Sequence, residues 1–209
     1  MRELARRLIS FSEELLRPED DVSWIAMLSA VKNYLKTLER YGKIRDSYAR
    51  EYAFERDFIL RHLRKGARHL DVGAGYGRFL RVFREAGVEL TLVDPDPVMR
   101  AILEAQGAVA IDARASSLPF GDGSFDSLSM TWVLHDLPEG ERRPSLRECF
   151  RVLRKGGVFI SFEPFMEGHD PSYIARFVRE NGRILELVIS QSAGSRGSRR
   201  VQYLAGVKA

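Results

Sequence analysis

The first 65 residues carry apolar side chains at the three- and four-residue spacing of amphipathic helices. One such series covers residues 4–15, and a second covers residues 25–38. The polar sequence Arg-Pro-Glu-Asp-Asp at 17–21 separates the two. A third series runs over 46–63 and stops before Gly66. We therefore expect three helices before residue 66.

Beyond Gly66 the apolar runs become short and alternate with amphipathic segments, several of which end at glycine. The runs predict strands at 68–73, 89–94, 108–112, 125–133 and 158–164. The amphipathic segments predict helices at 77–87, 97–107 and 139–157. This alternation indicates βαβ units and a parallel sheet, whose strands share one carboxyl edge where ligands bind.

The C-terminal segment has a different order of elements. A helix is expected at 173–182, followed by strands at 183–190 and 201–209 with no helix between them. Two such strands pair antiparallel. The sequence thus predicts an α/β fold: a Rossmann-like, doubly wound, mostly parallel seven-stranded sheet with a C-terminal antiparallel hairpin. Residues 1–65 would form an N-terminal helical cap or lid, and residues 66–209 a second domain.

A glycine-rich turn follows the first expected strand, in the sequence HLDVGAGYGRFL at 69–80. Glycine permits positive φ and lets a backbone approach a ligand closely. A dinucleotide fingerprint, G-x-G-x-x-G, would require a third glycine at position 78, where Arg78 stands. The spacing is G-x-G-x-G, so a nicotinamide-dependent oxidoreductase is disfavoured.

Acidic residues end three successive strands at the same expected edge. Asp71 precedes the glycines, Asp94 ends the second strand and Asp112 ends the third. A carboxylate after the second strand is well placed to accept hydrogen bonds from ribose hydroxyls. One such residue alone is more often a turn or cap residue. Three in register predict a nucleotide-containing cofactor.

At this point the sequence resembles the class I S-adenosylmethionine-dependent methyltransferases over about residues 66–165. LDVGAGYGRF is similar to the family's motif D-x-G-x-G-x-G, and LVDPDPVM to its acidic second motif. DARASSLPFGDGSFD resembles D-x-x-x-L-P-F-x-D-x-S-F-D. RVLRKGG is similar to R-x-L-K-P-G-G, with Lys155 where proline is usual. Small-molecule and quinone-type methyltransferases look like the nearest subgroup.

The resemblance implies S-adenosylmethionine as cofactor and a role for each matching residue. Asp71 would meet the methionine ammonium, and Asp94 would hold the ribose hydroxyls. Asp112 and the Ala113 amide would recognise the adenine edge. The other cofactor contacts implied are the backbone of Gly73, Ala74 and Gly75, the side chains of Pro95 and Met99 near adenine, and Thr131 and Trp132 beside the reactive methyl.

His135 is the one candidate general base, because it follows the fourth strand at the cofactor edge and a neutral imidazole accepts protons near pH 7. Methyl transfer from a sulfonium depends mainly on alignment, so catalysis would rest chiefly on positioning. Tyr48 in the third expected helix is a further candidate contact to the cofactor, although aromatic residues at helical spacing are more often core.

Composition leaves most partners open. The 33 Lys and Arg against 29 Asp and Glu give a net charge of +4, which permits but does not favour a nucleic-acid partner. The basic turn at 194–200 contains no aromatic residue that could stack on bases. A single cysteine, Cys149, excludes an intrachain disulfide and is typical of a reducing compartment. No membrane span and no metal site are expected, and we predict a cytoplasmic protein.

The leading hypothesis is therefore methyl transfer to a small molecule through an O, N or C nucleophile. One alternative is a non-catalytic S-adenosylmethionine-binding or interaction protein that retains the fold. Another is an RNA or protein methyltransferase, although residues 131–136 read TWVLHD rather than an N-P-P-Y-like motif. The sequence identifies neither the acceptor atom nor the oligomeric state.

Overall fold

The computed structural model of this chain describes residues 45–194 and 197–209, with side chains at 50–191 and 200–209. The two helices expected within residues 4–38 and most of the cap at 1–65 lie outside the described residues. Tyr48 lies in the first turn of a described helix, but its side chain is outside the described set.

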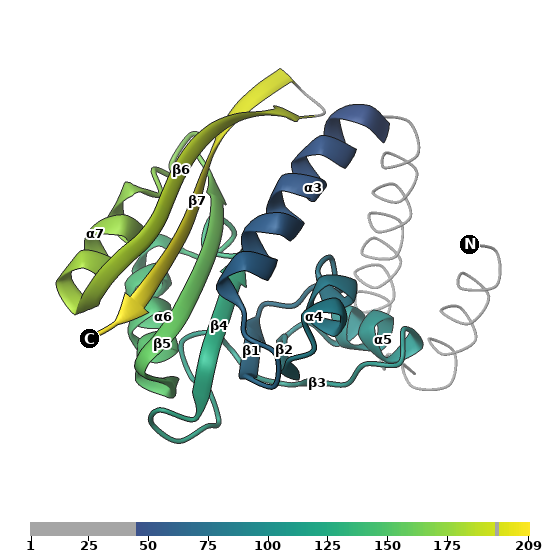
Figure 1. Cartoon of the computed structure of the whole chain (residues 1–209), viewed down its shortest axis with the longest axis vertical. Coiled ribbons are helices and arrows are strands. Elements are labelled where there is room, and N and C mark those ends of the chain that lie inside the picture. Colours follow the sequence, from purple (N-terminus) through teal and green to yellow (C-terminus); the bar gives the residue numbers. More distant parts are fainter. Residues whose placement is uncertain (1–44, 195–196) are drawn as a thin grey trace, which may run out of the picture.

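Seven strands form one sheet in the order β3-β2-β1-β4-β5-β7-β6. The first five strands are mutually parallel, and β7 runs antiparallel to both β5 and β6. This arrangement confirms the predicted parallel sheet with an antiparallel C-terminal hairpin (Figure 1). The strands are β1 (Arg68–Val72), β2 (Glu89–Val93), β3 (Ala110–Ile111), β4 (Phe125–Thr131), β5 (Leu153–Pro164), β6 (Gly182–Gly194) and β7 (Gly197–Lys208).

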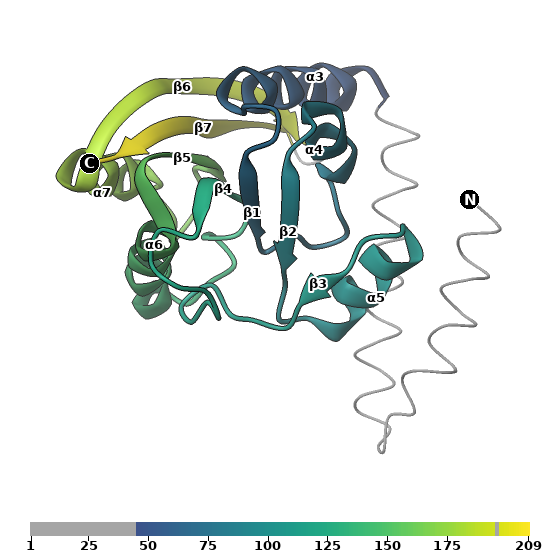
Figure 2. The ribbon, with the colours of Figure 1, turned by 60° about the horizontal axis from the view of Figure 1, so that its bottom comes forward.

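Five described helices connect and cover these strands. They are α3 (Arg45–His62), α4 (Leu80–Ala86), α5 (Pro97–Ala105), α6 (Glu139–Val152) and α7 (Ser172–Asn181). Helix α3 crosses the sheet on the side of α4, whereas α6 and α7 lie together at the other side (Figure 2). The connections from β1 to β2, from β2 to β3 and from β4 to β5 thus return over the sheet through a helix, as in βαβ units, whereas a loop joins β3 to β4.

Alternate residues of the central strands enter different cores, because successive side chains point to opposite faces of a sheet. Phe159 and Leu204 pack with α6 and α7. Ile160, Phe162 and Tyr203 pack with α3 and α4 instead. Helices therefore cover both faces of the sheet, and the carboxyl edge of the parallel strands is where the topology predicts a ligand.

Several boundaries differ from the sequence prediction: β5 begins at Leu153 rather than residue 158, β6 ends at Gly194 rather than residue 190, and β7 begins at Gly197 rather than residue 201. Strand β3 has only two residues, and α4 begins at Leu80 rather than residue 77. Helix α6 ends at Val152 rather than residue 157, because Leu153 already pairs with Phe125 of β4. Gly156 then takes a φ of +68°, which a right-handed helix does not allow.

Candidate cofactor and acceptor site

The glycine-rich turn between β1 and α4 has the open backbone that its sequence predicts. Gly73 and Gly75 both have positive φ, at +70° and +54°. A Cβ on Gly73 would lie 2.6 Å from Cγ2 of Val133, so this backbone must pass close to the segment after β4. A Cβ on Gly75 would meet no protein atom within 4 Å. The turn therefore presents bare backbone to open space.

Asp71 lies beneath this turn at the end of β1. It is 6% exposed, and Oδ1 accepts a hydrogen bond from Ser129 Oγ at 2.5 Å. Burial raises the pKa of Asp71 to about 7, the Ser129 hydrogen bond lowers it and the nearby Asp94 raises it. Among the described residues, no lysine or arginine forms an ion pair with this carboxylate. Its chemistry therefore suits a cationic ligand group such as an ammonium.

Asp94 at the end of β2 joins two neighbouring loops. Its Oδ2 accepts from the Gly75 amide at 2.8 Å, and its Oδ1 accepts from the Asp96 amide at 2.9 Å. Burial raises its pKa, and both backbone hydrogen bonds counteract that effect. The carboxylate is thus held in one orientation beside the glycine turn, where each oxygen retains a second lone pair for a ligand hydroxyl.

The residues after β3 lie farther out on the same edge. The Asp112 side chain is 70% exposed and pairs with Arg100 of α5 at 3.0 Å. Ala113 is buried, Met99 is half-buried on α5 and Pro95 is exposed. The structure therefore places these four predicted residues outside the recess that Asp71 lines.

A recess of about 150 Å³ brings together six of the predicted cofactor residues. It lies where β1 and β4 end, which is the edge that the parallel topology predicts. The lining residues are Asp71, Gly73, Ala74, Gly75, Tyr76, Arg78, Phe79, Thr131 and Trp132.

Trp132 closes this recess in a strained conformation. Its φ is +61°, a left-handed value that is rare for a bulky residue and concentrates at functional sites. The Trp132 amide donates to Phe162 O at 2.8 Å, and its indole Nε1 donates to Glu55 Oε1 at 2.9 Å. The first hydrogen bond fixes the Trp132 backbone beside β5, and the second holds the indole ring against the recess.

Glu55 of α3 is a site residue that the sequence did not predict. It is fully buried and accepts from Arg78 Nη2 at 2.5 Å as well as from Trp132. The Arg78 guanidinium lies over the rings of Phe79 and Trp132, at 5.3 and 5.9 Å from their centroids. The available signal in the sequence was Arg78, because a basic residue directly after the glycines indicates an acidic partner nearby.

Glu163 is the second residue that the sequence did not predict, and it lies beside His135. It is fully buried near the end of β5, and its Oε1 accepts from the amides of Val133 and Leu134 at 2.9 and 2.8 Å. Its Oε2 lies 2.8 Å from His135 Nδ1. A carboxylate accepts only, so Nδ1 carries the proton and Nε2 carries the lone pair. The available signal in the sequence was an acidic residue inside the apolar run VFISFEP, because a carboxylate in a buried strand requires hydrogen-bond donors.

A row of rings leads away from Trp132. Centroid distances are 6.3 Å from Trp132 to His135, 6.1 Å from His135 to His169 and 5.8 Å from His169 to Tyr173. Both ring nitrogens of His169 and the Tyr173 hydroxyl are buried without a hydrogen-bond partner among the described residues. Burial lowers the pKa of His169, so this ring is predominantly neutral near pH 7.

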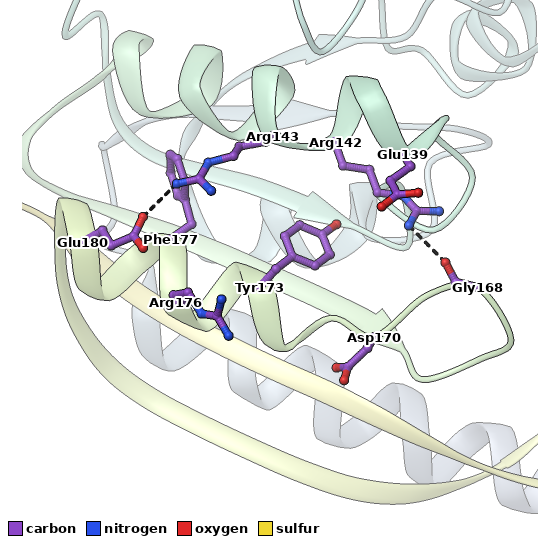
Figure 3. Close-up of a pocket in the computed structure, with 9 residues that line it drawn as sticks. All are labelled: Glu139, Arg142, Arg143, Gly168, Asp170, Tyr173, Arg176, Phe177 and Glu180. Carbon is purple, nitrogen blue, oxygen red and sulfur yellow. Dashed lines mark hydrogen bonds and ion pairs between the residues drawn. The ribbon is translucent and has the colours of Figure 1, made fainter.

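A larger cavity of about 390 Å³ opens between α6 and α7 (Figure 3). It contains none of the predicted site residues, although Tyr173 at the end of the ring row lines it. Arg143 pairs with Glu180 at 3.0 Å, and Arg142 donates to the Gly168 carbonyl at 3.2 Å. Acidic and basic side chains alternate around the opening, so its charge selects neither cations nor anions.

The remaining predictions concern the basic turn, the single cysteine, membrane spans and metal sites. Of the basic turn at 194–200, Arg200 lies 4.4 Å above the Phe165 ring, while Arg196 and the Arg199 side chain are outside the described set. Cys149 is buried in α6, and burial raises the pKa of its thiol. No helix in the described part of the chain is long and apolar enough to cross a membrane. Across residues 45–194 and 197–209, no cluster of metal-ligating side chains occurs.

Comparison with known proteins gives a consistent assignment. Residues 70–161 match the family model described as a methyltransferase domain. The ubiquinone/menaquinone biosynthesis C-methyltransferase UbiE of Yersinia enterocolitica is 33% identical over 149 residues, which cover 64% of this chain and 58% of UbiE. An uncharacterized protein of Methanocaldococcus jannaschii is 34% identical over 126 residues, which cover 60% of this chain and 58% of that protein. The matched part of this chain thus spans less than two thirds of the length of these relatives.

Solved structures agree on the fold. The 1,6-didemethyltoxoflavin-N1-methyltransferase of Burkholderia thailandensis, solved with S-adenosylhomocysteine, superposes with a TM-score of 0.62 at 19% identity. The match covers 93% of this chain and 92% of that one. The strand order, the glycine turn and the matched family model together lead to one conclusion. Over residues 70–161 this chain is similar to the methyltransferase-domain family, and its fold is that of the solved methyltransferase.

Proposed function

We propose that this protein transfers the methyl group of S-adenosylmethionine to a small-molecule acceptor, mainly by positioning, with His135 as general base. The observation that carries the proposal is the contact between His135 and the buried Glu163, beside the Trp132 wall of the recess. A buried carboxylate that fixes the tautomer and orientation of a histidine is a recurrent arrangement in general-base catalysis.

The cofactor supplies a methyl group on a sulfonium, with a neutral leaving group. The chain's own residues would bind and orient it: Asp71 holds the ammonium, and Asp94 accepts from the ribose hydroxyls. Pro95, Met99, Asp112 and Ala113 would lie along the adenine. Bare backbone at Gly73, Ala74 and Gly75 leaves room for close approach.

The acceptor end would lie at Thr131 and Trp132. His135 Nε2 would take a proton from an acceptor hydroxyl, amine or carbon acid, while Glu163 keeps the opposite ring nitrogen protonated. UbiE methylates carbon by its name, and the toxoflavin enzyme methylates nitrogen by its name. Both act on small molecules by those names, which supports a small-molecule acceptor without selecting the atom.

We also propose that residues 1–65 form a cap over this edge and residues 66–209 the cofactor-binding domain, with Tyr48 near the cofactor. Support comes from α3, because its Glu55 reaches the recess wall through Trp132 and Arg78. Deleting residues 1–44 should weaken acceptor binding more than cofactor binding. Equal losses in calorimetric titrations of the two ligands would remove the cap from the proposal.

The test of the cofactor residues is calorimetric titration with S-adenosylmethionine and, separately, with NADH. We expect saturable binding of the first alone, and loss of that binding in Asp94→Ala. A binding curve unchanged by Asp94→Ala would contradict the proposed ribose contact.

The test of His135 follows S-adenosylhomocysteine release in a screen of hydroxyl, amine and carbon-acid acceptors. His135→Ala should lower kcat by about 10²-fold or more, as loss of a general base does, with the cofactor Kd within about threefold. His62→Ala is the matched control, because His62 also pairs with a glutamate, Glu186, but on α3 and β6. If kcat of His135→Ala equals that of the wild type at every pH, His135 is not a general base and catalysis rests on positioning only.

A further inference from the structure

Four polar side chains lie in a row on the face of the sheet that α4 covers. In the parallel pairing of β1 with β4, His69 stands opposite Ser127 and Asp71 stands opposite Ser129. All four are buried, with exposed fractions between 0 and 6%. The His69 ring packs against Phe83 of α4, with centroids 4.6 Å apart. An uncompensated polar group is costly in such a place, so the partners of each atom are informative.

Hydrogen bonds link the four side chains into one chain, which we call the His69 relay. Ser127 Oγ lies 2.8 Å from His69 Nδ1, and His69 Nε2 lies 2.9 Å from Ser129 Oγ. Ser129 Oγ lies 2.5 Å from Asp71 Oδ1. The relay therefore runs from the interior of the sheet to the carboxylate at the recess.

Counting protons fixes the direction of the relay. An ionised Asp71 only accepts hydrogen bonds, so the single hydroxyl proton of Ser129 must be donated to Asp71. Ser129 must then accept from His69, which requires the proton on Nε2. Burial lowers the pKa of His69 to about 3, so the ring is neutral and its Nδ1 accepts from Ser127. Each donor in the relay thus has one direction when Asp71 is charged.

We propose that His69 is a positioning residue for cofactor binding: by donating to Ser129, it commits the Ser129 hydroxyl to Asp71 and favours the ionised carboxylate. The inference rests on the proposed contact between Asp71 and the methionine ammonium. Without the Nε2–H donor, the Ser129 hydroxyl is free to rotate away, and Asp71 loses its only hydroxyl donor among the described residues. Binding of a cation would then require a higher pH.

Few other charges act on Asp71. Asp94, on the loop after β2, raises its pKa. Arg78 in the glycine turn also lines the recess, but it is bound to Glu55 of α3. These groups are unchanged in relay variants, and so is the ammonium of the cofactor. Differences between variants in the pH dependence of binding therefore report on the relay.

The experiment measures the Kd for S-adenosylmethionine between pH 5.5 and 9 in the full-length protein. We expect His69→Leu and Ser129→Ala to move the midpoint upward by about one pH unit, which is about a fivefold weaker Kd near pH 7. Near pH 9 both should bind within about twofold of the wild type. Because they interrupt the same relay, the double variant should shift no further than either single one.

Ser161→Ala is the matched control. Ser161 of β5 is equally buried, and its hydroxyl has no hydrogen-bond partner among the described residues. Its loss should leave the midpoint unchanged. His69→Gln retains an amide donor and should return the midpoint toward that of the wild type. A loss of affinity in His69→Leu that is equal at every pH would overturn the relay and leave His69 a packing residue.

Nitrogen-15 NMR of the wild-type protein tests the relay without any substitution. Near pH 9 the His69 ring should be the neutral Nε2–H tautomer, and the Nδ1–H tautomer would overturn the proposed direction. Asp71→Asn separates the two levels of inference. Wild-type binding in Asp71→Asn would refute the ammonium contact itself, whereas weakened binding together with an unshifted His69→Leu would refute only the relay.

Discussion

At the scale of single residues, Asp71 is a carboxyl group whose charged form the fold disfavours. Its pKa is raised from 3.8 to about 7, so the folded state binds the proton more tightly than the unfolded state. The free energy of unfolding therefore falls as pH rises from about 4 to about 7. Asp71→Asn should raise it by about 1 to 3 kcal/mol at pH 8, and chemical denaturation measures the change.

The same denaturation at pH 4 is the control for this prediction. Both folded proteins are then neutral at position 71, and partial ionisation of the unfolded Asp71 adds only about 0.5 kcal/mol, so the free energies of unfolding should agree within about 1 kcal/mol. A difference of equal size at pH 4 and pH 8 would mean that the substitution changes packing rather than charge.

Site residues differed in how well the sequence revealed them. Asp71 and Asp94 follow apolar strands, and parallel topology brings such strand ends to one edge, so their grouping was predictable. Glu55 and Glu163 were not, because their partners come from distant segments: Trp132 is 77 residues from Glu55, and His135 is 28 residues from Glu163. Pairing of that kind becomes visible only when the sheet register is known.

At the scale of elements, α3 stabilises the wall of the recess through one buried ion pair. Glu55 is fully buried, and the Arg78 side chain is only 16% exposed. Glu55→Ala removes the carboxylate that both Arg78 and Trp132 contact, so we expect a loss of about 3 to 5 kcal/mol in the free energy of unfolding. Glu85→Ala breaks the exposed contact between Arg56 and Glu85 and should cost about 0 to 1 kcal/mol. Similar losses in urea denaturation of the two variants would contradict this role of α3.

Helices and strands were predictable from periodicity, whereas their ends depended on contacts that the pattern does not contain. The amphipathic series through α6 continues to residue 157, yet the helix stops at Val152 because Leu153 joins β4 in the sheet. Likewise, α4 starts only at Leu80, after the glycine turn has completed its positive-φ residues. Tertiary pairing thus overrides local helical propensity at the end of α6, whereas the positive-φ glycines delay the start of α4.

At the scale of the whole molecule, the antiparallel hairpin was predictable because no helix fits between the last two strands. Predicting the order of the strands in the sheet needs more than the hydrophobic pattern: it needs the βαβ crossover rule and the family resemblance. This order puts β1 and β4 side by side, and the recess, the His69 relay and the His135–Glu163 pair all lie on or next to β4. Cofactor binding should therefore stabilise the central strands that hold the whole fold together.

Cofactor binding should consequently raise the melting temperature of the entire protein, and more so at pH 8 than at pH 6. A ligand at about 100 times its Kd adds about 2.7 kcal/mol, which corresponds to about 5 to 10 °C for a domain of this size. Below pH 7 the gain should shrink, because Asp71 binds a proton that the ammonium must displace. Differential scanning calorimetry measures both shifts, with Asp94→Ala and NADH as controls that should show none. An equal shift at pH 6 and pH 8 would mean that the cofactor binds without the charge on Asp71.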